Sequence, residues 1–380
     1  MKRRVGLVIP TLEAVGGAER MVMALAEGLA QRGWKVTVLT LSGEIPHERR
    51  RAMRGVEAIS LEMRRAWIDP RGWRRFRAWQ RENPVDILHG HLAHGAWFAR
   101  MAGVLGVRRM VVLDTLHSTR LGGDWTRRIY QWTRGRADCV TAVSEAVSEA
   151  ARSAGIARQI RVVRNGVALD LLRRASPSDS REFVWLAVGR LEPVKDYPRL
   201  LRAFARVAER DARPMRLEIV GDGCERGRLK ELAEELRIDG RVCWRGFQED
   251  VSGAYAGADA VVLASRWEGL PVCLMEAGAT GLPVVTTATA GALEIVIPEV
   301  TGLAVPLLAE NAGGDAAEDL QDSLATAMIR VMAMEAGERD AMGERAWRRV
   351  AAEFSRERMV SAYEAIYCEL LERDSQTRRG

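Results

Sequence analysis

The stretch that decides the fold is "DAVVLASRWEGLPVCLMEAGATGLPVVTT", residues 259–287. Its two ends, "DAVVLAS" (259–265) and "LPVVTT" (282–287), are short runs of apolar and β-branched residues typical of buried strands. Between them we predict a helix from about Pro271, because proline is favoured at the first helical position. Strand, helix and strand in this order predict a parallel sheet with helices on both faces.

The same alternation runs along most of the chain. We predict further strands at 4–10, 35–41, 85–91, 109–117, 138–144, 160–166, 183–190, 217–223, 241–247 and 301–306, with a helix over 18–33 ending at Gly33. A polar segment with Pro177 and serines, residues 171–182, interrupts the pattern and is predicted to be a linker. The expected fold class is therefore α/β, with two Rossmann-like, doubly wound domains facing a central cleft.

The expected boundaries are 1–170 for the first domain and 183–354 for the second. A flexible loop is predicted over 308–318. A final helix over about 355–372 has one apolar face, on which it could pack back on the first domain. That face carries Phe354, Met359, Tyr363, Ile366, Tyr367 and Leu370.

Composition excludes several classes of protein. The 380 residues include five cysteines without any CxxC pairing, which argues against a zinc ribbon or a disulfide framework and fits a reducing cytosol. No apolar run approaches the roughly 18 residues that a membrane span needs. No GxGxxG follows the first strand of either domain, so a dehydrogenase-type dinucleotide site is unsupported. The basic start runs into Glu13 and Glu19 without a small-residue cleavage site, which favours a first strand and glycine loop over a signal peptide.

Positive charge is concentrated in one stretch. Residues 47–82 hold eleven arginines and no lysine against five acids, an excess equal to the net charge of +6 of the whole chain. The stretch also holds Trp67, Trp73 and Trp79. One interpretation is a solvated helical face. Another is an anionic membrane surface with the tryptophans at headgroup level, and nucleic acid is disfavoured because no binding motif accompanies the charge.

Chemically suggestive residues follow the predicted strands, where open α/β sheets bind ligands. Glu268 lies in the loop after 259–265, and Glu276 falls in the second turn of the helix that follows. Free amides at the start of a helix attract phosphate, and a carboxylate can accept hydrogen bonds from vicinal hydroxyls of a sugar or ribose. The alternative is that both glutamates are ordinary helix-start acids.

Two cations follow the strand over 183–190. Arg190 ends that strand and Lys195 lies in the next loop. Facing one cleft, they would suit a diphosphate whose charge must be held and then increased. Two surface cations are the alternative.

The first domain has weaker signals. Gly16 and Gly17 separate its first strand from its first helix and allow close approach of the backbone to a ligand, although a plain turn explains them equally well. His117 follows a strand and could bind a sugar, or could be structural. The trio His89, His91 and His94 is interpreted as cleft lining rather than a zinc site. No Asp-x-Asp occurs, which removes the usual carboxylate pair for a divalent ion, and no metal is expected.

Taken together, these motifs resemble family 4 (group 1) retaining glycosyltransferases of the GT-B superfamily. The resemblance covers nearly the whole chain. It rests on "GGAER", "TAVSEAV", "RNGV", "GRLEPVKDYPRLLRAF", "VGDGCERGRL", "EGLPVCLMEA" and "TGLAV", in family order and spacing. Two positions depart from the pattern: Leu293 replaces a common proline before Glu294, and Asp196 follows Lys195 where Asn or Gly is commoner.

The resemblance implies roles for the residues singled out above. Arg190 and Lys195 would neutralise the diphosphate leaving group, and Glu268 and His117 would adjoin the donor sugar. Glu276 would bind the ribose hydroxyls of the nucleotide. Gly17 would face the phosphates, with Gly16 as a second candidate. Further nucleotide contacts would come from Gly269, Leu270 and Gly221. No cofactor is implied, because the UDP- or GDP-sugar is a substrate. The two domains would close over it and exclude water.

The sequence therefore predicts a retaining, metal-independent hexosyltransferase that glycosylates a hydroxyl of a glycan or lipid-linked acceptor in cell-envelope or exopolysaccharide biosynthesis. We expect a cytoplasmic protein, with peripheral attachment to the inner face of the plasma membrane as a further hypothesis. Two alternatives remain open. One is a non-catalytic nucleotide-sugar-binding module, and the other is a nucleotide-sugar epimerase on the same fold.

Overall fold

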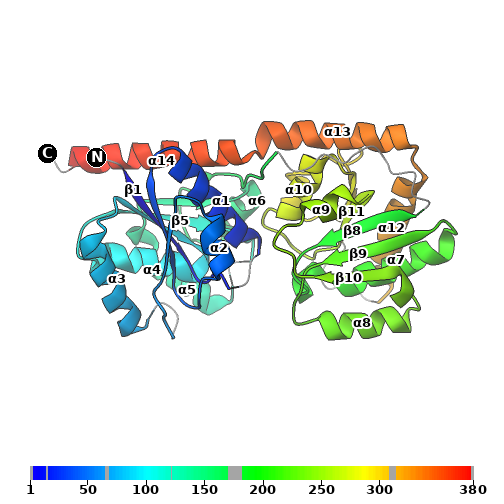
Figure 1. Cartoon of the computed structure of the whole chain (residues 1–380), viewed down its shortest axis with the longest axis horizontal. Coiled ribbons are helices and arrows are strands. Elements are labelled where there is room, and N and C mark those ends of the chain that lie inside the picture. The colour runs from blue at the N-terminus through cyan, green and yellow to red at the C-terminus, as the bar shows by residue number, and fades with distance from the viewer. Residues whose placement is uncertain are drawn as a thin grey trace. The chain divides into compact units, whose positions relative to one another are not determined.

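The computed structural model describes residues 3–13, 16–64, 68–120, 122–169, 182–307 and 314–377. It forms two compact units: unit 1 is Met1–Gly166 with Arg356–Gly380, and unit 2 is Val167–Ser355. The linker expected at 171–182 lies outside the described residues except for Glu182. Both units are α/β, as predicted, and Figure 1 shows their elements.

Unit 1 is built on a seven-stranded parallel sheet in the order β3-β2-β1-β4-β5-β6-β7. Its strands are β1 (Arg4–Ile9), β2 (Lys35–Thr40), β3 (Glu57–Ser60), β4 (Ile87–His91), β5 (Val111–Leu116), β6 (Cys139–Ala142) and β7 (Arg161–Val162). Its helices are α1 (Gly17–Gln31), α2 (His47–Ala52), α3 (Pro70–Glu82), α4 (Leu92–Leu105), α5 (Asp124–Trp132), α6 (Glu145–Ser153) and α14 (Arg356–Thr377). The central strands β1, β4 and β5 are almost wholly buried, as expected for a parallel sheet covered by helices on both faces.

The arginine-rich stretch folds into α2, β3 and α3. The sequence did not predict the four-residue edge strand β3. Trp79 is only 8% exposed and belongs to the apolar core, while Trp73 stacks on Phe98 with ring centroids 4.5 Å apart. The headgroup position suggested for Trp73 and Trp79 is therefore wrong, because both side chains lie on the face of α3 that packs on the core of unit 1. Trp67 lies outside the described residues.

Unit 2 contains a six-stranded parallel sheet in the order β10-β9-β8-β11-β12-β13. Its strands are β8 (Phe183–Val188), β9 (Met215–Val220), β10 (Val242–Gly246), β11 (Ala260–Leu263), β12 (Val284–Thr287) and β13 (Leu303–Val305). Its helices are α7 (Tyr197–Arg210), α8 (Arg226–Glu235), α9 (Ser252–Ala256), α10 (Val272–Thr280), α11 (Ala290–Leu293), α12 (Gly314–Ala333) and α13 (Ala336–Glu353). Short 3-10 turns are η1 (Arg134–Arg136) in unit 1, and η2 (Pro193–Lys195) and η3 (Asp239–Arg241) in unit 2.

Two sequence predictions in unit 2 need correction. Pro271 caps α10 instead of starting it, a difference of one residue at a helix end. The loop expected over 308–318 is wrong from Gly314 onward, because α12 begins there, and residues 308–313 lie outside the described residues.

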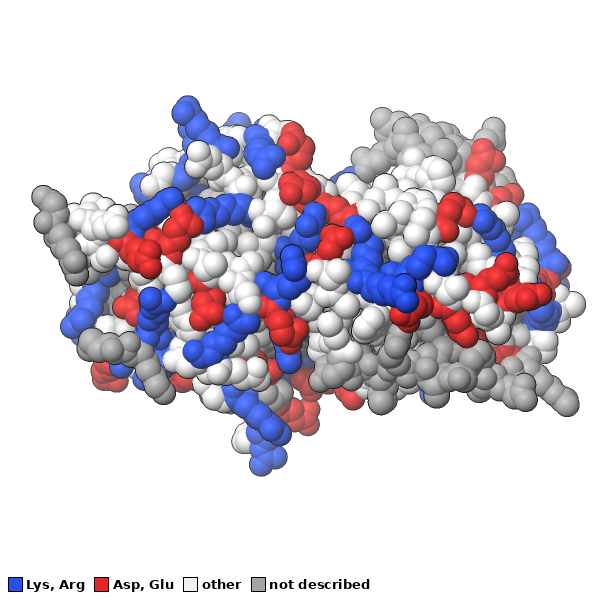
Figure 2. All heavy atoms as spheres, turned by 90° about the horizontal axis from the view of Figure 1, so that it is seen from above, with Lys and Arg blue, Asp and Glu red and all other residues white. Residues whose placement is uncertain are grey.

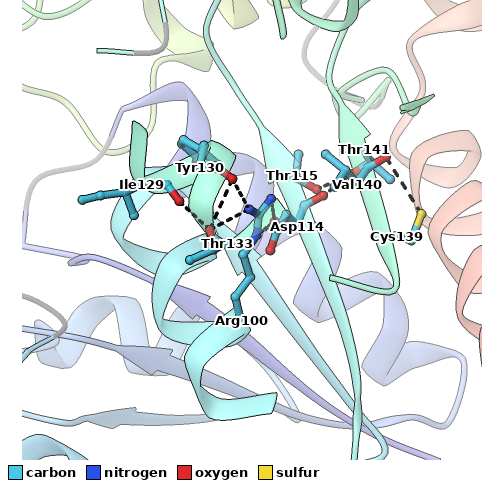
Figure 3. A network of polar contacts seen from close by, with 9 residues as sticks. All are labelled: Arg100, Asp114, Thr115, Ile129, Tyr130, Thr133, Cys139, Val140 and Thr141. Atoms are coloured by element: carbon cyan, nitrogen blue, oxygen red, sulfur yellow. Dashed lines mark hydrogen bonds and ion pairs between the residues drawn. The ribbon is translucent and has the colours of Figure 1, made fainter. Parts of the chain in front are cut away.

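A buried ion pair ties together three elements of unit 1 (Figure 3). Arg100 of α4 and Asp114 of β5 both have fully buried side chains, and Nη2 of Arg100 lies 2.5 Å from Oδ2 of Asp114. Arg100 also donates to the backbone oxygen of Tyr130 at 3.2 Å and to Oγ1 of Thr133 at 2.9 Å. Burial raises the pKa of Asp114 to about 6, against the opposing effect of Arg100. These contacts fasten the end of α5 to the core.

Helix α14 completes unit 1 from the far end of the sequence. It packs on α1 (Figure 1), and its buried residues include all of the predicted apolar face except Phe354, which instead ends α13. The hydroxyl of Tyr367 lies 2.6 Å from Nδ1 of His89, and that of Tyr363 lies 3.0 Å from Oγ1 of Thr115. Arg161 donates to both oxygens of Glu369.

Charge is mixed over the surface seen in Figure 2, where basic and acidic side chains are interspersed. Among the described residues, no helix is both long enough and apolar enough to cross a bilayer.

Candidate functional site

The site in unit 2 lies where two neighbouring strands end. β8 and β11 are parallel and adjacent, with Trp185 opposite Ala260, so the segments after them emerge at one edge of the sheet. Nζ of Lys195, in the turn after β8, lies 2.6 Å from Oε1 of Glu268, in the loop after β11. The structure thus brings together one predicted diphosphate ligand and one predicted sugar ligand.

The pair sits in a largely enclosed position, with side chains 17% and 12% exposed for Lys195 and Glu268. Ser265 donates to the same Glu268 oxygen at 2.6 Å, and the backbone oxygen of Ser265 is held by Thr287. Burial opposes the charge of Lys195, but the Glu268 carboxylate outweighs it and raises the pKa of Lys195 above its ordinary value. Lys195 is therefore protonated, and so positively charged, near pH 7.

The two loops are fastened to each other by the backbone. The amide of Arg266 donates to the carbonyl of Val194 at 2.9 Å, directly before Lys195. The Arg266 guanidinium also bonds Asp196 at 3.0 Å, and Arg199 pairs with the same carboxylate at 3.0 Å. Sequence reasoning had noted Asp196 only as a departure from the family pattern.

The two departures from the family pattern have structural explanations. Asp196 has φ 49°, in the left-handed region that Asn and Gly tolerate best, and its two arginine partners stabilise an aspartate there. The amide of Leu293 donates to the Thr289 carbonyl at 3.0 Å, a bond that proline could not make.

Arg190 is placed differently from Lys195. Its side chain is 55% exposed, and Nη1 pairs with Glu192 at 2.9 Å. The structure therefore does not bring Arg190 to Glu268, although it keeps the guanidinium in the loop that follows β8.

Glu276 lies in the second turn of α10, as predicted, and only 8% of it is exposed. Its Oε2 accepts a hydrogen bond from Tyr255 of α9 at 2.8 Å. Sequence reasoning missed Tyr255, because nothing in a single tyrosine on a short helix shows that it will meet a carboxylate 21 residues away.

Glycines let segments approach one another closely at this edge. Gly221, which follows β9, has φ 149°, and a Cβ there would collide with the carbonyl oxygen of Gly189. A Cβ at Gly291, in α11, would meet the carbonyl oxygen of Gly269 and would lie 2.7 Å from that of Glu268. Gly221 thus has a packing role, and Gly291, which the sequence did not single out, lies against the Glu268 loop. Leu270 is buried beside Gly269.

In unit 1, Gly17 is the first residue of α1 and Gly16 is its N-cap. The amide of Gly16 already donates to Oε2 of Glu19 at 2.9 Å, so this amide is occupied by the helix's own acid.

His117 follows β5, and its Nε2 lies 3.1 Å from Nδ1 of His91. Burial lowers the pKa of His117 to about 4 and that of His91 well below its ordinary value, so both rings are neutral near pH 7. His89 is a core residue bonded to Thr115 and Tyr367, and His94 packs edge-on against Trp97. In the described part of the chain, no three or more His, Cys, Asp or Glu side chains gather as a metal site would require.

Comparison with known proteins agrees with this arrangement. Residues 15–171 match the model of Glycosyltransferase Family 4, and residues 170–348 match Glycosyl transferases group 1. An N-acetyl-alpha-D-glucosaminyl L-malate synthase of Bacillus anthracis is 30% identical over 310 residues, covering 78% of this chain and 77% of that protein. The chain belongs to glycosyltransferase family 4. Another relative, a lipopolysaccharide core biosynthesis glycosyltransferase of Rhizobium meliloti, is 29% identical over 92% of this chain and 94% of its own length.

Solved structures show the fold of this family 4 enzyme independently. A sucrose-phosphate synthase from Thermosynechococcus elongatus superposes with a TM-score of 0.82 at 23% identity, covering 98% of this chain and all of that one. The Anabaena HepE protein, solved in complex with UDP and glucose, gives 0.80 at 19% identity, covering 97% of this chain and 100% of that one. The two Rossmann-like units are thus those of the GT-B fold.

Proposed function

We propose that this family 4 glycosyltransferase moves a hexosyl unit from a nucleotide diphosphate sugar to a hydroxyl of a glycan or lipid-linked acceptor, with retention and without a metal ion. The observation that carries the proposal is the Lys195–Glu268 pair at the adjoining ends of β8 and β11. A cation kept protonated by a carboxylate can stabilise the charge that grows on a departing diphosphate.

The other site residues take roles around this pair. Arg190, exposed in the same loop, would exchange its Glu192 partner for phosphate. Glu276 would hold the ribose hydroxyls from its place on α10, beside Gly269 and Leu270. Gly221 would keep the β9 loop close to the β8 loop.

Unit 1 would supply the remaining contacts and the acceptor site. Gly17 would present a helix-start amide to phosphate, and the occupied amide of Gly16 makes it the weaker candidate. Neutral His117 would donate or accept a hydrogen bond at the donor sugar without adding charge. The leaving diphosphate could itself take the acceptor proton, so no separate base is assigned.

Support for the acceptor class comes from two relatives. The name of the Rhizobium meliloti relative states lipopolysaccharide core synthesis. An Escherichia coli protein, 28% identical over 273 residues, is named for the transfer of galactose to a diphosphoundecaprenol-linked sugar. Support for the donor class comes from the HepE complexes with UDP-glucose. By extension, we assign the protein to cell-envelope or exopolysaccharide synthesis at the cytoplasmic face of the membrane. UDP and GDP donors both fit the proposal.

The deciding experiment measures nucleotide-sugar turnover by purified variants in the presence of a lipid and glycan extract. Lys195→Ala should lower the rate by about 10²-fold or more, because it removes a cation aimed at developing charge. Arg190→Ala should act in the same direction. Lys230→Ala, an exposed lysine of α8, is the matched control and should leave the rate unchanged.

Normal turnover in both Lys195→Ala and Arg190→Ala would contradict the diphosphate assignment. Isomerised donor in the absence of any acceptor would indicate the epimerase. Tight donor binding without transfer or isomerisation would indicate a binding module.

A further inference from the structure

Helix α5 exposes two tryptophans on one face. Trp125 is 73% exposed and Trp132 is 65% exposed, the two largest exposures among the bulky apolar side chains of the described residues. They are seven residues apart, which is nearly two turns, so they share one side of the helix. Arg128 lies between them on that side, and its side chain is exposed as well.

The opposite side of α5 is fixed to the core of unit 1. Tyr130 is 2% exposed, and its backbone oxygen and the Thr133 hydroxyl both bond the buried guanidinium of Arg100 (Figure 3). Gln131 donates to the carbonyl of Ala154 at 2.8 Å, just beyond α6. Because the contacts of Tyr130 and Thr133 with Arg100 are buried, α5 cannot turn its tryptophans inward without breaking a buried polar network.

The surroundings of the exposed face are strongly basic. Residues 120–136 contain five arginines and a single acid, Asp124, which pairs with Arg127 at 3.1 Å. The Arg136 guanidinium lies 4.5 Å from the centroid of the Trp132 ring. In the part of the chain that the structure describes, Arg128 and Arg134 form no hydrogen bond or ion pair, so their charges are available to a partner.

A cavity lined by several arginines involves residues that follow η1 in the sequence. Asp138 lies two residues after Arg136, within about 8 Å of it along the chain. It helps to line a cavity of about 330 Å³. Four arginines line the same cavity: Arg152, Arg158, Arg161 and Arg373. Glu369 neutralises Arg161 and Arg373, and Glu149 pairs with Arg152, so Arg158 is the cavity's unpaired cation among the described residues.

This combination fits a lipid surface better than a protein partner. Tryptophans favour the boundary between water and acyl chains, and basic side chains beside them attract anionic headgroups. The two arginines beside the tryptophans, Arg128 and Arg134, favour an anionic lipid surface over the apolar groove of a protein partner. The exposed face of α5 therefore complements an anionic lipid surface into which tryptophan side chains can insert.

We propose that the α5 face, comprising Trp125, Arg128 and Trp132 with Arg134 beside them, is the surface by which the protein binds anionic membranes. The proposal rests on the membrane-attached acceptor suggested above but concerns a different set of residues from the donor site. It also replaces the arginine-rich residues 47–82 as the main lipid contact, because the described tryptophans of that stretch pack inward.

The test is co-sedimentation of the full chain with vesicles of phosphatidylglycerol and phosphatidylcholine in equal amounts, compared with phosphatidylcholine alone. Wild-type protein should bind the anionic vesicles, and binding should weaken as salt rises. Trp125→Ser/Trp132→Ser and Arg128→Glu/Arg134→Glu should each weaken binding by roughly tenfold or more. Brominated lipid should quench tryptophan fluorescence in the wild type and lose that quenching in the tryptophan double variant.

Three control variants and one activity measurement make the result specific. Ile297→Ser/Val300→Ser changes two exposed apolar residues of unit 2, and Arg228→Glu/Arg348→Glu reverses two exposed charges there, with both pairs expected to bind as the wild type does. Arg74→Glu/Arg75→Glu/Arg77→Glu reverses charges on α3 and should have the smaller effect. Donor turnover in detergent should stay normal in the α5 variants, which shows that they are folded.

Equal vesicle binding by the wild type and the tryptophan double variant would overturn the proposal. So would a loss of binding confined to the α3 variant, or a wild type that does not bind anionic vesicles. None of these outcomes bears on the transfer reaction, which is tested separately with Lys195→Ala.

Discussion

At the scale of the residue, Lys195 and Glu268 depend on each other. The carboxylate raises the pKa of the lysine against the effect of burial, and the lysine in turn offsets the cost of an enclosed carboxylate. A group that is buried without its partner changes its protonation state rather than stay charged. The pair therefore sets the pH range over which a cation is present at the site.

We predict that Glu268→Gln shifts the alkaline limb of the pH–rate profile. Without the carboxylate, burial is the main remaining influence and the pKa of Lys195 falls, so the protonated form is lost at lower pH than in the wild type. The measurement is kcat/KM for donor turnover against pH. An alkaline limb at an unchanged pH, whatever the overall rate, would show that Lys195 does not need to be protonated.

The sequence predicted which residue types lie at this edge, because strand ends of a parallel sheet converge and the motifs carried Lys195, Glu268 and Glu276 to them. It could not predict their partners. Ser265, Tyr255 and Arg266 reach the site through contacts between segments 3 to 70 residues apart. Such contacts depend on the packing of whole elements, which local patterns do not encode.

At the scale of the element, the loops are positioned by close backbone approach. Gly291 of α11 lies against the carbonyls of Gly269 and Glu268, whereas Gly253 of α9 has open space where a Cβ would be. Both are helical glycines, so they form a matched pair that differs in surroundings.

We predict that Gly291→Ala lowers donor turnover and thermal stability, because the new methyl group must push the Glu268 loop away. Gly253→Ala should be neutral or slightly stabilising, since alanine favours a helix by about 1 kcal/mol over glycine. Melting temperature and turnover are measured for both. Equal melting temperatures and equal turnover in the two variants would show that the Glu268 loop can move away from the new methyl group without loss of stability or activity.

The Arg100–Asp114 pair joins α4, β5 and α5, and it should matter to stability more than surface pairs do. We predict that Arg100→Met destabilises the protein by about 3–5 kcal/mol, because Asp114 is left buried without its partner. Arg100→Met/Asp114→Leu should cost less than that. Chemical unfolding measures both, with the exposed pair Arg330–Glu299 as control, for which Arg330→Met should cost no more than about 1 kcal/mol.

Elements themselves were predicted well where they are apolar and long, as in β1, β5 and β8. The edge strand β3 was missed because it has only four residues and begins with Glu57, so no apolar run marks it. The Arg100–Asp114 ion pair could not be predicted either. Asp114 lies within the mostly apolar strand β5, and nothing in the pattern of that strand indicates an arginine partner on α4.

At the scale of the whole molecule, unit 1 is assembled from two distant parts of the chain. Tyr363 and Tyr367 of α14 bond Thr115 and His89 within the unit 1 core. The sequence indicated the apolar face of this helix and suggested the first domain as its partner, and the contacts place it on α1 and β5.

We predict that Tyr367→Ala destabilises unit 1 alone, by about 3–5 kcal/mol, because it leaves a cavity and removes the partner of His89. Hydrogen exchange should accelerate in β4 and β5 and stay unchanged in β8 and β9. Tyr367→Phe, which removes only the hydroxyl, should cost about 1–3 kcal/mol. Uniform acceleration in both units would show that they unfold as one.

The position of α14 has a consequence for biosynthesis. A ribosome releases the seven strands of unit 1 first, yet their missing layer emerges only after all of Val167–Ser355 has been made. Unit 2 is continuous and can fold while translation proceeds. The nascent chain therefore finishes its second half before its first, and in that interval the uncovered His89 and Thr115 surface is what a chaperone would meet.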